Sequence, residues 1–257
     1  MDLIVNYLPP GLGFWSALFI CLASGFTSLV SAVAGVGGGT ILLGLLSQLL
    51  PVSALIPVHG VIQLGSNIFR TVLLFKHASM TILVPFIIGS IVGSISSSVL
   101  VLQLPVWAIQ LGIGLFILYT IFFRVPEFGK GHILFAGSLS GFLTMLFGAT
   151  GPFVGAFIRT LNLKSTQHIA TQAALMSFQH LIKLIVFGFL GFAFAPYMPL
   201  LSVMLICAFI GTYTGRFILF QIDQSLFRKI LNTVLILLAL RLIWQAINSA
   251  GWLTPAL

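Results

Sequence analysis

The stretch Ser24–Thr40 reads SGFTSLVSAVAGVGGGT, and a related stretch, Ser140–Gly155, reads SGFLTMLFGATGPFVG. Both open with Ser-Gly-Phe and contain glycines near their ends, and positions 24 and 140, 35 and 151, and 39 and 155 are each 116 residues apart. Clustered glycines interrupt helices because they lack the side chain that restricts the backbone. The sequence therefore predicts one glycine-broken helix in each half of the chain.

Composition places these broken helices in a membrane. Of the 257 residues, 59% are hydrophobic and only 5% are charged, too few for the surface of a soluble domain. Stretches of about 20 residues carry almost no charge and are long enough to cross about 30 Å of hydrocarbon. The chain is therefore predicted to be an all-α integral membrane protein, multi-pass in the cell membrane.

The few charged residues exclude several kinds of site. The three acids, Asp2, Glu127 and Asp223, lie at the terminus or in predicted loops, so no carboxylate falls in a membrane segment. Intramembrane proton relays and sodium sites usually employ Asp or Glu. Cys21 and Cys207 lie in apolar stretches and indicate neither a disulfide nor a metal site. The net charge of +8 is explained by the positively charged cytoplasmic loops that membrane proteins usually have. We therefore expect lipid and no nucleic acid as a partner.

Each half is predicted to form a glycine-broken hairpin, made of a long helix and a short half-helix, followed by three spanning helices. The short piece 40–50 covers only about 16 Å, half of the hydrocarbon core. Each half then crosses the membrane an odd number of times, which makes the two halves inverted-topology repeats. The loop Arg124–His132 is the natural boundary, giving a first repeat at 1–126 and a second, inverted repeat at 127–257. The expected elements are 14–34, 40–50, 52–75, 81–101 and 105–123, then 132–148, 153–161, 165–195, 198–220 and 226–247.

The positive charges indicate the orientation. With both termini outside, every turn rich in Lys or Arg falls on one face and the remaining turns on the other, as the positive-inside rule requires. These positive turns are near Lys76, Arg124–Lys130, Arg159–Lys164 and Arg228–Lys229.

The two glycine-rich tips are candidate binding elements. Free N–H groups at a helix N-terminus attract anions, and glycine lets a ligand approach the backbone. Thr150 offers a hydroxyl N-cap, and Pro152 suits the first helical position. The same glycines also fit GxxxG helix packing, which is the competing interpretation. The candidate residues of the tips are Gly37, Gly38, Gly39, Thr40, Thr150, Gly151 and Pro152.

A polar stripe follows each tip, on the helices expected at 52–75 and 165–195. At a separation of 113 residues, Arg70 pairs with Lys183, Asn67 with His180, and His59 with Gln172. Polar groups at membrane depth face the protein interior or a water-filled cavity, and cationic, amide-rich faces suit an oxyanion. The competing interpretation is that the amides join neighbouring helices and that Arg70, close to the end of its span, snorkels to the membrane surface. The candidate binding residues of the stripes are His59, Gln63, Asn67, Gln172, Gln179, His180 and Lys183.

The sequence contains no catalytic or metal-binding motif, so an enzyme is not expected and no cofactor is assigned. His59 and His180 could in principle hold haem, but no second histidine pair accompanies them. Proton coupling, if present, would run through His59 or His180 or through protonation of the anion itself. An anion channel and a membrane scaffold or redox subunit are the alternatives to a carrier.

The phrases SGFTSLVSAVAGVGGGTILLGLL and SGFLTMLFGATGPFVGAFI resemble the TauE/SafE family of sulfite and organosulfonate exporters. The resemblance covers nearly the whole chain and implies a secondary transporter of two repeats that moves a small anion, sulfite or a small organosulfonate. It departs from the family pattern at Ala149–Phe153, where a triple glycine is common, so the two half-sites are expected to be unequal.

Overall fold

The computed structural model describes residues 8–34, 37–123, 132–218 and 224–251, and these form ten α-helices and no strand. The first half contains α2 (Phe14–Ala34), α3 (Gly38–Leu46), α4 (Val52–Leu74), α5 (Met80–Gln103) and α6 (Val106–Phe122). The second half contains α7 (Ile133–Phe147), α8 (Gly151–Thr160), α9 (Ser165–Phe189), α10 (Met198–Ile218) and α11 (Gln224–Ser249).

Both predicted helix breaks are confirmed, and the order of long and short helices is as expected. The short helices begin earlier than predicted, at Gly38 instead of 40 and at Gly151 instead of 153. Helix α9 ends at Phe189 instead of 195, because Gly191 adopts φ +86°, a left-handed conformation that ends a helix. The predicted boundary between repeats, 126/127, and tip residues 35–36 lie outside the described residues.

Six helices are long and apolar enough to cross a membrane, and α6 and α7 are shorter apolar helices. Many of their large apolar side chains point outward, among them Trp15, 71% exposed, and Phe189, 89% exposed. Such surfaces suit contact with lipid.

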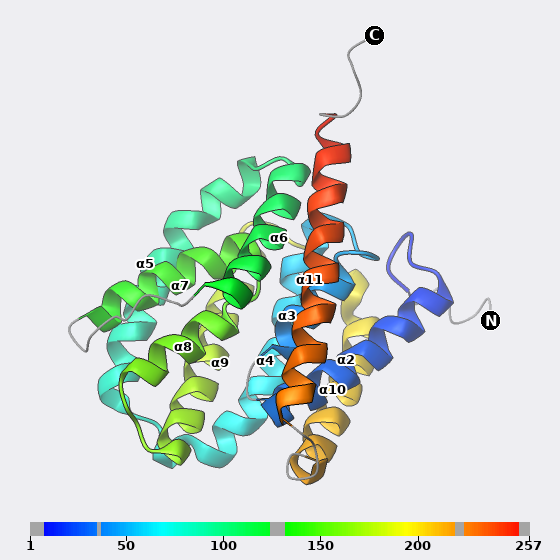
Figure 1. The fold of residues 1–257 in the computed structure, drawn as a ribbon. Helices are drawn as coiled ribbons and strands as arrows, with labels where there is room; N and C mark the ends of the chain where they lie inside the picture. The colour runs from blue at the N-terminus through cyan, green and yellow to red at the C-terminus, as the bar shows by residue number, and fades with distance from the viewer. Residues whose placement is uncertain (1–7, 35–36, 124–131, 219–223, 252–257) are drawn as a thin grey trace.

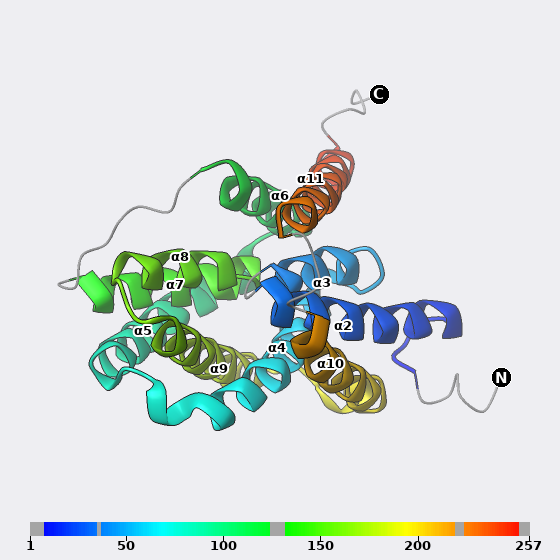
Figure 2. The same cartoon turned by 60° about the horizontal axis from the view of Figure 1, so that its bottom comes forward.

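The helices pack across the two halves (Figures 1 and 2). Helix α10 lies along α2, and α5 lies along α7, so each pair joins one half to the other. Helices α4 and α9 pack together and lie between these two pairs in both views. Helix α6 packs on α11.

Glycines allow the paired backbones to approach closely. A methyl group at Gly93 would collide with the Ser138 carbonyl of α7, so Gly93 is a packing residue between these helices. On the other pair, a methyl group at Gly211 would collide with the Gly25 carbonyl. In lipid no hydrophobic driving force brings helices together, so such interfaces are stabilised by the close packing that small residues allow. The Ser24 hydroxyl adds a hydrogen bond of 2.9 Å to the Met204 carbonyl.

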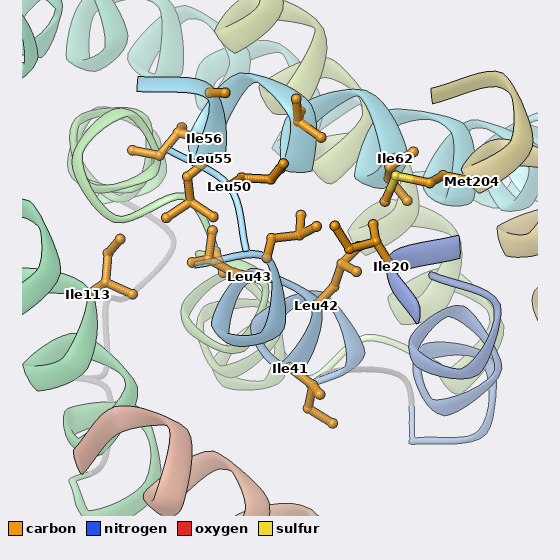
Figure 3. Packing of buried hydrophobic residues seen from close by; sticks show 14 of the residues in the cluster. Ile20, Ile41, Leu42, Leu43, Leu50, Leu55, Ile56, Ile62, Ile113 and Met204 are labelled. Atoms are coloured by element: carbon orange, nitrogen blue, oxygen red, sulfur yellow. The ribbon is translucent and has the colours of Figure 1, made fainter. Parts of the chain in front are cut away.

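The short helix α3 lies in the centre of the larger apolar cluster (Figure 3). Leu42 and Leu43 of α3 are fully buried in this cluster. Leu43 lies toward Leu55 of α4, and Leu42 lies toward Ile20 of α2. A second cluster surrounds Phe157 of α8, whose ring stacks on Phe86 of α5. Apolar packing therefore holds each short helix along its length, and the N-terminus of each lies at the glycine tip.

Candidate functional site

The two short helices begin without side-chain caps. Gly37, the N-cap residue of α3, adopts φ +100°, and Gly148 after α7 adopts φ +81°, conformations that glycine accepts at little cost. Neither α3 nor α8 receives a hydrogen bond from the side chain of its N-cap residue. The first-turn N–H groups of a helix have no intrahelical acceptor and carry partial positive charge. Both tips therefore present backbone donors.

The tips and the polar stripes line one small cavity of about 40 Å³, part of it open to the surroundings. Ten of the fourteen predicted binding residues line this cavity, namely Gly37, Gly39, Thr40, His59, Gln63, Asn67, Gly151, Pro152, Gln172 and His180. Gly38, Thr150, Gln179 and Lys183 do not line it. The structure therefore brings both tips and both stripes to one place.

Gly38 contacts the preceding helix instead of the cavity. A methyl group here would collide with the Thr27 carbonyl and the Ser31 hydroxyl of α2. At the next residue, Gly39, a methyl group would lie 2.7 Å from Gln63 Oε1, on the cavity side. Gly38 thus allows the hairpin to close, and Gly39 leaves room for the cavity.

The predicted hydroxyl cap of Thr150 is wrong. Thr150 is the N-cap residue of α8, but its hydroxyl donates to Gln179 Oε1 at 2.9 Å instead of capping the helix. Gln179 Nε2 in turn donates to the Ser140 hydroxyl at 2.7 Å. Pro152 is the second residue of α8 and not the first, because the helix begins at Gly151. The fully buried Thr150 therefore joins the second tip to α9 and α7.

Lys183 is fully buried and donates to the Gly148 carbonyl at 2.9 Å. Its side chain passes over Gly60 of α4, where a methyl group would lie 3.0 Å from Lys183 Cε. Lys183 therefore holds the second tip against α9, behind the cavity wall. Gly60 was not singled out in the sequence because nothing in its spacing indicates which side chain crosses it.

Arg70 and Ser31 line the cavity but are absent from the predicted binding residues. Arg70 Nη2 donates to Asn67 Oδ1 at 2.9 Å, and Asn67 Nδ2 donates to the Gln63 carbonyl at 2.7 Å. The guanidinium thus turns back along α4 and does not extend away from it. Its place on the polar stripe was the signal that could have identified it, but its position near the end of the span also fitted snorkelling.

Two histidines lie at the inner end of the cavity. His59 Nε2 is 2.8 Å from the Gly39 carbonyl, and the rings of His59 and His180 meet edge to face with centroids 6.1 Å apart. Both side chains are 1% exposed. Within the described residues, neither ring nitrogen of His180 has a hydrogen-bond partner.

The cavity opens toward one end of the molecule. Along α4 the lining changes from buried His59 to half-buried Arg70, and along α9 from buried His180 to half-buried Gln172. These half-buried ends coincide, because the end of α4 lies beside the start of α9, where the Ser79 N–H donates to the Thr171 hydroxyl. Beyond the histidines the interior is filled by Lys183 and the apolar cluster around α3.

The electrostatic character of the site is cationic. Arg70 lies in the cavity wall and Lys183 lies behind it, while Gln63, Asn67 and Gln172 contribute amide groups. The described ranges contain no Asp or Glu, since the three acids of the chain are at positions 2, 127 and 223. Charge-assisted and backbone N–H donors without a competing carboxylate suit an anion.

Comparison with known proteins identifies the family. The model of the family described as "Sulfite exporter TauE/SafE" matches residues 20–242, which include all ten helices in whole or in part. No curated protein and no solved structure matches the chain. The match covers most of the sequence and both glycine tips. The chain therefore belongs to the TauE/SafE family of sulfite exporters, and it is a multi-pass membrane transporter and not an enzyme.

Proposed function

We propose that the protein is a secondary transporter that moves a small anion, sulfite or a small organosulfonate, through the cavity between the two tips. The observation that carries this proposal is the cavity itself, which two uncapped helix N-termini and Arg70 line, with no carboxylate among its described lining residues. A compact oxyanion offers several acceptors to donors converging from α3, α4, α8 and α9. Ten of the fourteen predicted binding residues line this cavity, and Gly38 packs against Ser31 of its lining.

The two halves are proposed to be inverted repeats that move relative to each other. Helix α2 ends at 34 and α7 at 147, and α3 begins at 38 and α8 at 151, so both differences (147 − 34 and 151 − 38) are 113. The packing between the halves follows the same correspondence. The first helix of each half packs on the fourth helix of the other, since α2 pairs with α10 and α7 pairs with α5. This arrangement supports alternating access by one repeat against the other.

The proposed orientation places both termini outside and the open end of the cavity toward the cytoplasm. Lys76, Arg159 and Lys164 are exposed and lie close to the end of α4, the end of α8 and the start of α9. These helix ends are the ones toward which the cavity opens. The conformation is then the inward-open state of the cycle.

Flux through proteoliposomes tests the proposal. Purified protein is assayed with a panel of sulfite, thiosulfate, sulfate and a taurine-like sulfonate, with empty liposomes as the control. Saturable uptake that is accelerated by the same anion on the other side supports a carrier. Unitary currents in planar bilayers would instead identify an anion channel. Failure of every anion, with transport of an organic cation, would overturn the anion assignment.

A further inference from the structure

The inner end of the cavity contains two imidazoles with unused hydrogen-bonding capacity. His59 and His180 come from the crossing helices α4 and α9, and their ring centroids are 6.1 Å apart. Both side chains are 99% buried and both line the cavity. Buried polar groups in proteins are almost always hydrogen-bonded, so unpartnered ones that line a cavity are available to a bound ligand or water.

The contact of His59 determines which of its nitrogens is free. A backbone carbonyl only accepts hydrogen bonds, so the Nε2 atom 2.8 Å from the Gly39 carbonyl carries the hydrogen. In the neutral ring Nδ1 is then a lone-pair acceptor, and it has no partner among the described residues. This nitrogen is available to take a proton without breaking an existing bond.

His180 has more unpaired ring nitrogens than His59. A neutral imidazole has one donor and one acceptor nitrogen, and neither nitrogen of His180 is paired within the described residues. One can donate to an anion in the cavity while the other accepts a proton.

The groups around the pair carry positive charge or none. Helix α2 contributes Ser31, α3 contributes Thr40 and the Gly39 carbonyl, and α8 contributes the backbone at Gly151 and Pro152. The charged side chains are Arg70 of α4 and Lys183 of α9. Uncompensated charge is costly at membrane depth, and no carboxylate in the described part of the lining compensates a proton. A bound anion supplies that compensation.

We propose that His59 and His180 form a proton site that is occupied together with the anion, so that one proton moves with each anion. This rests on the proposed function. The bound proton attracts the anion, and the bound anion stabilises the proton. By linkage the anion then binds more tightly as the pH falls, up to about tenfold per pH unit for one proton. Two adjacent imidazolium ions would repel, so the pair holds one proton.

The test measures protons moved per anion in proteoliposomes that contain a pH-sensitive dye, with the membrane potential clamped by potassium and valinomycin. The probe is the fastest of thiosulfate, sulfate and a small sulfonate, since none of these carries a proton at neutral pH. We expect about one proton per anion in the unaltered protein. In His180→Gln and His59→Gln the ratio should fall toward zero even where transport is also slower, because the ratio does not depend on rate. His77→Gln, at an exposed turn, is the matched control and should keep the ratio.

The outcomes separate this inference from the proposed function. Anion uptake by the unaltered protein without proton movement, or an unchanged ratio in both histidine variants, overturns the proton site. If both variants are inactive, two measurements on the unaltered protein decide whether the proton site stands. These are the number of protons moved per anion and the pH dependence of anion binding. Absence of uptake for all the anions, including sulfite, overturns the proposed function instead.

Discussion

The close approach of α2 and α3 at the first tip makes Gly38→Ala the sharpest test of the hairpin. The added methyl group would collide with the Thr27 carbonyl and the Ser31 hydroxyl and would lie 2.9 Å from the Ser31 backbone nitrogen. Two of these three atoms are backbone, so they cannot rotate away. Overpacking of this kind costs about 1–3 kcal/mol.

Gly188→Ala in α9 is the matched control, because a methyl group there has no atom within 4 Å. Alanine in a helix gains about 0.5–1 kcal/mol over glycine, so the difference between the two variants is about 1.5–4 kcal/mol. At about 2–4 °C per kcal/mol for a chain of this size, the midpoints should differ by about 3–16 °C.

The assay is thermal unfolding of detergent-purified protein, followed by intrinsic tryptophan fluorescence and by the fraction that remains monodisperse after heating. Both variants are heated at one rate, since membrane proteins often unfold irreversibly. Equal midpoints for Gly38→Ala and Gly188→Ala would refute the close packing of α3 on α2.

Three further substitutions test the site. Gly39→Ala should slow anion transport with a smaller loss of stability than Gly38→Ala, because its methyl group would press on the movable amide of Gln63 at 2.7 Å; initial uptake rates check this. Arg70→Gln should raise the half-saturating anion concentration about 10- to 150-fold, as expected for a charged hydrogen bond of about 1.5–3 kcal/mol, and a normal value would exclude Arg70 from the site. Lys183→Met should lower the free energy of unfolding by about 1–3 kcal/mol, because the buried Gly148 carbonyl loses its donor at 2.9 Å; an unchanged melting temperature would contradict that bond.

Exposed Arg159→Gln is the control for Arg70→Gln. It removes one positive charge without touching the cavity lining, so it separates a local effect on the anion from a general effect of net charge.

Periodicity predicted the parts of the fold that depend on long apolar runs and on glycine. The break after α2, the short α3 and the shared face of His59, Gln63 and Asn67 all follow from spacing along one segment. The separation of 113 residues, seen first in the polar stripes, also relates the starts of α3 and α8, whereas the Ser-Gly-Phe phrases are 116 apart. The separation of 116 residues relates the glycines that pack on α10 and α5. The tips instead have the separation of the polar stripes.

Contacts between distant segments could not be predicted in this way. Lys183 and Thr150 are on the expected face or tip, but nothing local indicates that Lys183 bonds the Gly148 carbonyl or that Thr150 bonds Gln179. The direction taken by Arg70 depends on where the cavity opens, which is a property of four helices together. A long flexible cation near a span end has two favourable environments, and only tertiary structure chooses between them.

The pairing of α2 with α10 has a consequence for biosynthesis. The Ser24 hydroxyl bonds the Met204 carbonyl, 180 residues later in the chain. At about 5–20 residues per second, a ribosome needs roughly 9–36 s to supply that partner. During this time the first helix is inserted without the neighbour that its glycine and serine face requires. We therefore expect α2 to remain beside lipid or the insertion machinery until the second half is translated, so that truncation before α10 leaves the first helix exposed to quality control.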